Sequence, residues 1–120
     1  MAVVFGAFGA HGLTKIVNEK DLLIWNKAVL YQLIHTVAIL FIGLALKLEM
    51  NKLLKVSFNL FVFGILLFSG SLYLLTFRDV LNFGVWKNVL GPVTPIGGLS
   101  FLAGWFCLFI YGLKLDKNEK

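Results

Sequence analysis

One uncharged stretch constrains the fold of this chain more than any other feature. The 22 residues from Val56 to Phe77 carry no formal charge and lie between Lys55 and Arg78. A helix of this length rises about 33 Å, which is enough to cross a hydrocarbon core of about 30 Å. Because lipid offers no partners to free backbone N–H and C=O groups, the stretch is predicted to be a transmembrane helix.

Small and polar residues fall on two sides of this predicted helix. At 100° per residue, Gly64 and Ser71 lie on one side, whereas Asn59, Ser69 and Tyr73 lie roughly opposite. A membrane helix with such groups on both sides is expected to have protein on both sides. The stretch is therefore predicted to be the central helix of a membrane bundle.

The composition agrees with a membrane protein of one domain, residues 1–120. Hydrophobic residues make up 59% of the chain and charged residues 14%, whereas soluble domains have about 45–50% and about 25%. Lys and Arg outnumber Asp and Glu by 11 to 6, but they stand in short runs between the apolar segments. This pattern is typical of anchoring at lipid headgroups, and it argues against a nucleic-acid-binding face.

Local signals place the ends of the neighbouring helices. Asn18 followed by Asp21 resembles a weak capping box, which starts a helix near Glu19 and puts Trp25 at the membrane interface. Near the C-terminus, Thr94 suits an N-cap and Pro95 the first turn of the last helix. The predicted helices cover approximately residues 1–11, 19–47, 54–77 and 95–114.

The first predicted helix is too short to span a membrane. The run from Met1 to Ala10 rises about 15 Å, half a bilayer. A signal peptide is a poor interpretation, because a basic leading region is missing and glycines interrupt the apolar run. We expect the second half of a spanning helix whose first half is absent. The predicted fold is thus an all-α integral membrane bundle with three full spans and a shortened first helix.

The connections suggest an orientation. Lys47–Lys55 reads as a tight basic loop, and residues 78–90 mix charged and apolar residues as a segment lying on the membrane surface would. The Lys47–Lys55 loop and the C-terminal tail together hold six Lys, against five basic residues in the two opposite connections. The excess predicts, by a narrow margin, that this loop and the C-terminus are cytoplasmic.

A polar cluster is predicted near one surface of the bundle. Gln32 and His35 share a helix face with Ala28 and Ile39, so this face should point inward, toward the third or first helix. Antiparallel threading brings further polar residues to the same half of the membrane, although only one of Ser71 and Tyr73 is expected to reach His35. The candidate cluster comprises His11, Gln32, His35, Ser71, Tyr73 and Thr94.

A second set of residues is predicted to pack helices together. Small residues at spacings of three or four let membrane helices approach closely. Glycine pairs at a helix start can also hold an anion, but close packing is the favoured interpretation of Gly97 and Gly98. The candidate packing residues are Gly6, Ala10, Gly64, Gly97, Ser100 and Gly104.

No catalytic set, metal site or cofactor site is predicted. A zinc site needs three or four ligands, whereas the chain offers two imidazoles and no carboxylate inside a span. Ser69 and Ser71 lack a nucleophile elbow and an acid to orient a histidine. His35 could serve function, because ionisable groups inside membranes are costly, but a neutral imidazole bonded to a neighbour is the favoured interpretation. Cys107, the single cysteine, is expected to be a buried small hydrophobe.

Four motifs in order suggest a family. GAFGAHGL (Gly6–Leu13), AVLYQLIHTVA (Ala28–Ala38), FSGSLYLL (Phe68–Leu75) and TPIGGLSFLAGW (Thr94–Trp105) together resemble the small bacterial membrane proteins grouped as domain of unknown function 423. The resemblance implies a four-helix inner-membrane protein, in which the first motif closes the first span. It also implies about half a helix more before Met1. It implies no established activity.

Two functions are favoured from the sequence, and a membrane enzyme on a lipid-soluble substrate, with histidine as its acid–base group, is a third. The first is a structural or accessory membrane protein, not an enzyme, that acts through helix contacts with itself or with a larger complex. The alternative is a carrier or permeation protein for a small polar or amphipathic solute, with a site around His35. Four short helices leave little room for alternating access unless the protein oligomerises, which favours the first function.

Overall fold

The computed structural model describes residues 1–81 and 86–118 of the chain, with side chains for residues 1–81 and 90–115. Within these ranges all regular structure is helical, which confirms the all-α prediction. The elements are α1 (Ala2–His11), a 3₁₀ turn η1 (Leu13–Lys15), α2 (Glu19–Leu48), α3 (Lys52–Gly64), a π-helical turn η2 (Ile65–Ser69), α4 (Gly70–Thr76) and α5 (Trp86–Asn118).

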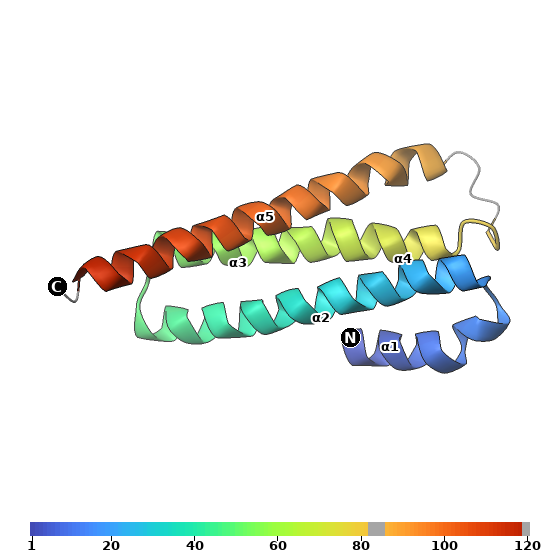
Figure 1. Ribbon diagram of the computed structural model, residues 1–120, viewed down its shortest axis with the longest axis horizontal. Coiled ribbons are helices and arrows are strands. Elements are labelled where there is room, and N and C mark those ends of the chain that lie inside the picture. Colours follow the sequence, from blue (N-terminus) through green and yellow to red (C-terminus); the bar gives the residue numbers. More distant parts are fainter. Residues whose placement is uncertain (82–85, 119–120) are drawn as a thin grey trace.

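The helices form an up-and-down bundle. α3, η2 and α4 continue one another as a single long helix, which lies between α2 and α5 and packs against both (Figure 1). Across the described part of the chain, three helical stretches are long and apolar enough to cross a membrane, namely Glu19–Leu48, Lys52–Thr76 and Leu90–Leu115. The predicted central helix and the three predicted spans are therefore confirmed.

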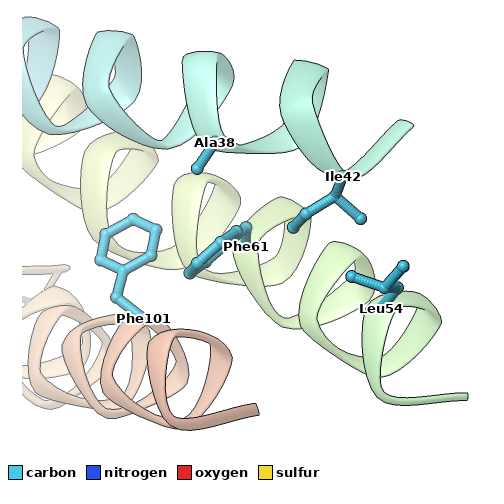
Figure 2. Close-up of a cluster of buried hydrophobic side chains, with 5 residues drawn as sticks. All are labelled: Ala38, Ile42, Leu54, Phe61 and Phe101. Atoms are coloured by element: carbon cyan, nitrogen blue, oxygen red, sulfur yellow. The ribbon is translucent and has the colours of Figure 1, made fainter. Parts of the chain in front are cut away.

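The apolar core lies where the three spanning helices meet. Ala38 and Ile42 of α2, Leu54 and Phe61 of α3, and Phe101 of α5 form one buried cluster (Figure 2). Phe61 is at its centre and is fully buried. Because lipid is as apolar as these side chains, close packing must stabilise the contact, with little help from exclusion of water.

Side-chain caps fix two helix starts. The Asn18 side chain accepts a hydrogen bond from the Asp21 backbone N–H at 2.9 Å, as the sequence predicts. Asn51 caps α3 in the same way by accepting from Leu53 N–H at 2.9 Å. This second cap was not predicted, and α3 therefore begins at Lys52, two residues before the predicted start.

The predicted start of the last helix is wrong. α5 begins at Trp86 and contains both Pro92 and Pro95, so Thr94 is not an N-cap. An unwound stretch in lipid would leave backbone groups without partners, and Ser or Thr side chains can compensate for the N–H that a proline lacks. The Thr94 hydroxyl donates to the Leu90 carbonyl at 3.2 Å, the ordinary bond of a helical threonine to the carbonyl four residues before it.

Two smaller expectations also change. The segment predicted to lie on the membrane surface is partly helix, because residues 86–90 belong to α5; residues 82–85 lie outside the described residues. Trp25 is 4% exposed and does not face the headgroups. Its indole N–H donates to the Phe5 carbonyl at 2.8 Å, so this side chain holds the short helix α1 against α2.

Candidate functional site

Gln32 and Tyr73 join α2 to α4. The Tyr73 hydroxyl donates to the Gln32 side-chain oxygen at 2.7 Å. The Tyr73 ring also packs at 4.5 Å, centroid to centroid, against Trp25 and at 4.9 Å against Phe5. Gln32 therefore faces the third span, as predicted, and its polar group is engaged by the protein.

His35 is held from three sides in the bundle interior. It is 3% exposed. Its Nδ1 lies 2.7 Å from the Tyr31 carbonyl, and the Trp105 indole N–H donates to its Nε2 at 3.2 Å. The ring stacks on Phe101 at a centroid distance of 3.5 Å and an angle of 8°.

These contacts define the protonation of His35. A carbonyl only accepts and an indole N–H only donates, so Nδ1 must carry the hydrogen and Nε2 must be bare. This is the neutral tautomer with both nitrogens occupied. A second proton on Nε2 would remove the bond from Trp105, which leaves no free position for a proton relay or a ligand in this arrangement.

Ser71 and Thr94 form a separate pair between α4 and α5. Their hydroxyl oxygens lie 2.7 Å apart, with either one able to donate, and the Ser71 hydroxyl also lies 3.0 Å from the Phe68 carbonyl. Neither Ser71 nor Tyr73 bonds to His35, although one of them was expected to do so. The two residues point to different neighbours, α5 and α2 respectively.

The structure thus divides the six candidate residues. Five of them make three local links between helices, and His11 is apart from these. His11 is exposed at the end of α1, where its carbonyl accepts from the Thr14 hydroxyl at 3.4 Å. Among the described residues, no group of three His, Cys, Asp or Glu side chains lies close enough to hold a metal ion.

The small residues concentrate where α5 crosses α3 and η2. Gly64, Gly97, Ser100 and Gly104 are all buried. A Cβ on Gly97 would lie 2.8 Å from the Phe68 Cα, so the two backbones are already in contact there. The Ser100 hydroxyl donates to the Leu60 carbonyl at 2.7 Å.

The two N-terminal candidates for packing are placed differently. Gly6 packs loosely on Val29 of α2, where an added Cβ would meet it at 3.5 Å. Ala10 is exposed. Gly9, which the sequence analysis passed over, is buried under the Trp25 ring, where an added Cβ would approach to 2.7 Å.

An apolar groove opens between α2 and α5, and Phe68 of η2 forms part of its wall. Its volume is about 500 Å³. Tyr31 and Phe68 line it at a centroid distance of 4.7 Å, and His35 lies at its inner edge. The remaining lining residues are Leu30, Ile34, Gly98, Phe101, Leu102 and Trp105.

Comparison with known proteins places this fold in a family. A family model described as "Protein of unknown function (DUF423)" matches residues 5–98. The chain belongs to the DUF423 family. The resemblance seen in the sequence is therefore confirmed, and the family carries no assigned activity.

Curated relatives of this DUF423 protein are named as membrane proteins. A UPF0382 membrane protein of Staphylococcus epidermidis is 44% identical over 95% of the chain and 87% of its own length. One from Haemophilus influenzae is 44% identical over 97% and 86%. UPF0382 membrane protein YwdK of Bacillus subtilis is 35% identical over 95% and 88%. No solved structure shows significant similarity to the chain.

The DUF423 chain also has a buried ion pair that the sequence analysis missed. The Asp21 carboxylate lies 2.8 Å from the Arg78 guanidinium and accepts from the Asn18 side-chain amide at 2.9 Å. The Thr76 hydroxyl reaches the Asp21 carbonyl at 3.4 Å. This group links the start of α2 to the end of α4. Asp21 was interpreted as a cap alone, and only the fold reveals its distant partner.

Two serines of the central helix were also missed. Ser57 donates to the Gly104 carbonyl at 2.9 Å. It shares a helix face with Phe61 and Gly64, a spacing that the sequence displays. Ser69 is fully buried in the π-helical turn, and its hydroxyl has no hydrogen-bond partner within the described chain. π-helical turns are rare and are frequent at functional sites.

Proposed function

We propose that this DUF423 protein is a structural or accessory protein of the bacterial inner membrane that acts through helix–helix contacts. One observation carries the proposal: His35 is buried, and both of its ring nitrogens lie within hydrogen-bond distance of the protein. It is the ionisable side chain deepest in the spans, where such groups most often signal transport or chemistry. Here it connects α2 to α5.

The other intramembrane polar groups support the same function. Gln32, Ser57, Ser71 and Ser100 each bond to a neighbouring helix of the chain. Such bonds contribute about 0.6 kcal/mol each on average in membrane proteins. A set of polar side chains engaged in this way stabilises a rigid bundle and offers little to a passing solute.

The proposed partner is a second copy or a larger membrane complex. α5 offers an exposed apolar row for this contact, with Phe106 and Phe109 on it. Photo-crosslinking tests the proposal directly. A photoreactive amino acid at Phe106 should yield discrete protein adducts in cells, and one at Leu40, on the far side of α2, serves as the matched control.

A combined result would contradict the proposal. The chain would be a strict monomer in mild detergent, and the crosslinker at Phe106 would capture lipid alone, as the Leu40 control does. The chain would then lack the partner that an accessory function requires.

The carrier alternative has one feature in its favour, since the α2–α5 groove reaches the edge of His35. It requires the bonds of His35 to open during transport. Solute flux into liposomes that falls with His35→Leu would support it. Identical flux for the parent and the variant would exclude it.

A further inference from the structure

Besides His35, one polar side chain of α2 lines the α2–α5 groove. Tyr31 lines the groove and is 40% exposed. Its hydroxyl makes no hydrogen bond to any residue that the structure describes, although its ring is packed against Phe68. A hydroxyl at the edge of the hydrocarbon region is costly to leave unpaired, so this site favours a ligand with an acceptor oxygen.

A positive charge lies one turn closer to the membrane surface. Lys27 precedes Tyr31 by four residues, so the two side chains are neighbours on one helix face, about 6 Å apart along the axis. Lys27 is exposed and forms no ion pair within the described ranges. It is the last charged residue before the uncharged run 28–46, which places it at the level of the lipid headgroups.

Apart from Tyr31 and the edge of His35, the groove is apolar. Its walls include Ile34, Phe68 and Leu102, and Gly98 lies on the α5 side. Its volume of about 500 Å³ falls within the range of about 300–1,000 Å³ that is typical of small-molecule sites. Ile34 and Leu102 are exposed, so the groove opens sideways toward lipid.

We propose that this groove binds one anionic phospholipid from the surrounding bilayer. The order along the site is cation, hydroxyl donor and apolar groove. A phospholipid has phosphate, ester carbonyl and acyl chain in the same order and at similar spacing. Lys27 pairs with the phosphate, the Tyr31 hydroxyl donates to an ester carbonyl, and one acyl chain lies against Phe68. A net negative lipid is preferred, because no headgroup amine competes with Lys27.

Native mass spectrometry of the purified chain tests the site. The protein is mixed with phosphatidylglycerol and phosphatidylethanolamine at equal concentration in a mild detergent. The parent should retain one phosphatidylglycerol in preference to phosphatidylethanolamine. Lys27→Gln and Tyr31→Phe should each weaken this binding about fivefold, the effect of losing one typical polar contact. Lys27→Arg should keep it.

Matched controls lie at the other end of the bundle. Lys47→Gln removes a charge from the opposite end of α2, and Tyr111→Phe removes a hydroxyl that bonds to Glu49. Both should retain the lipid as the parent does. Neither Lys27→Gln nor Tyr31→Phe removes a bond within the described chain, so both should keep the parent's helical circular dichroism.

Three results would overturn the inference. The first is equal retention of the two lipids by the parent. The second is unchanged retention in Lys27→Gln and Tyr31→Phe. The third is a dimer that carries no lipid, which would assign the groove to a second copy of the chain.

Discussion

Replacing Gly97 with alanine should loosen the contact between α5 and η2. A Cβ at this position would lie 2.8 Å from both the Cα and the Cβ of Phe68, whereas carbon atoms pack best at about 3.5–4.0 Å. The nearest obstacle is backbone, which cannot rotate away as a side chain can. The two helices must therefore separate by at least about half an ångström, which weakens every contact along their crossing.

The neighbouring glycine provides the reference for the size of this effect. A Cβ at Gly98 would meet the Phe68 ring at 3.8 Å, an ordinary contact. Both substitutions gain about the same helix propensity, about 1 kcal/mol, so this gain cancels in the comparison. The difference between Gly97→Ala and Gly98→Ala thus isolates overpacking, for which about 1–3 kcal/mol is typical.

Reversible unfolding in mixed micelles, followed by circular dichroism, measures this difference. Gly97→Ala should be less stable than Gly98→Ala by about 1–3 kcal/mol, and Gly98→Ala should equal or exceed the parent. Equal stability of the two variants, within about 0.3 kcal/mol, would refute the close approach of Gly97 to the Phe68 backbone.

Two further predictions concern the bundle ends. Arg78→Gln should cost about 3 kcal/mol of unfolding free energy in the same assay, because it leaves the buried Asp21 carboxylate unpaired. Asp79, an exposed partner of the same arginine, provides the control, and Asp79→Asn should change the unfolding free energy by less than about 0.5 kcal/mol. Equal costs for the two variants would refute a stabilising contact between Arg78 and Asp21. The predicted cytoplasmic position of the Lys47–Lys55 loop and the C-terminal tail can be tested by labelling single cysteines in a Cys107→Ser background. A cysteine in either segment should resist an impermeant thiol reagent in intact cells and react after permeabilisation. Labelling in intact cells would reverse the predicted orientation.

The fold was largely predictable because lipid restricts what a chain can do. An uncharged run long enough to cross the bilayer predicts a span almost regardless of which apolar residues it contains. Gly64 and Ser71, both buried, correctly indicated a face covered by protein. Asn59, by contrast, is exposed. Its position near the start of the uncharged run predicts a place near the other membrane surface, where a polar side chain can reach water.

The start of α5 could not be predicted by the same rules. Thr94-Pro95 is a typical helix start in water, where the chain before it can bond to solvent. Inside lipid the helix continues through Pro92 and Pro95, because ending it would cost more than keeping two prolines. The preference for Thr at an N-cap and Pro in the first turn therefore describes soluble helices and did not predict the start of α5.

The partners of the polar links could not be predicted. Helical spacing predicts only that Gln32, His35, Ser71 and Tyr73 lie in the same half of the membrane. It could not determine that Trp105, which is 70 positions away from His35, supplies the donor. Such pairings depend on the rotation of each helix about its own axis, and side-chain packing across the whole bundle sets that rotation.

The measurement that tests the central claim most directly is a double-mutant cycle between His35 and Trp105. His35→Phe keeps a ring to stack on Phe101, and Trp105→Phe keeps an aromatic side chain but removes the indole N–H. If intramembrane polar groups hold helices together, the unfolding free energies should show a coupling of about 0.6 kcal/mol, and at most about 1.7 kcal/mol. Strictly additive losses would contradict the account, because the bond between these two residues would then contribute nothing to the bundle.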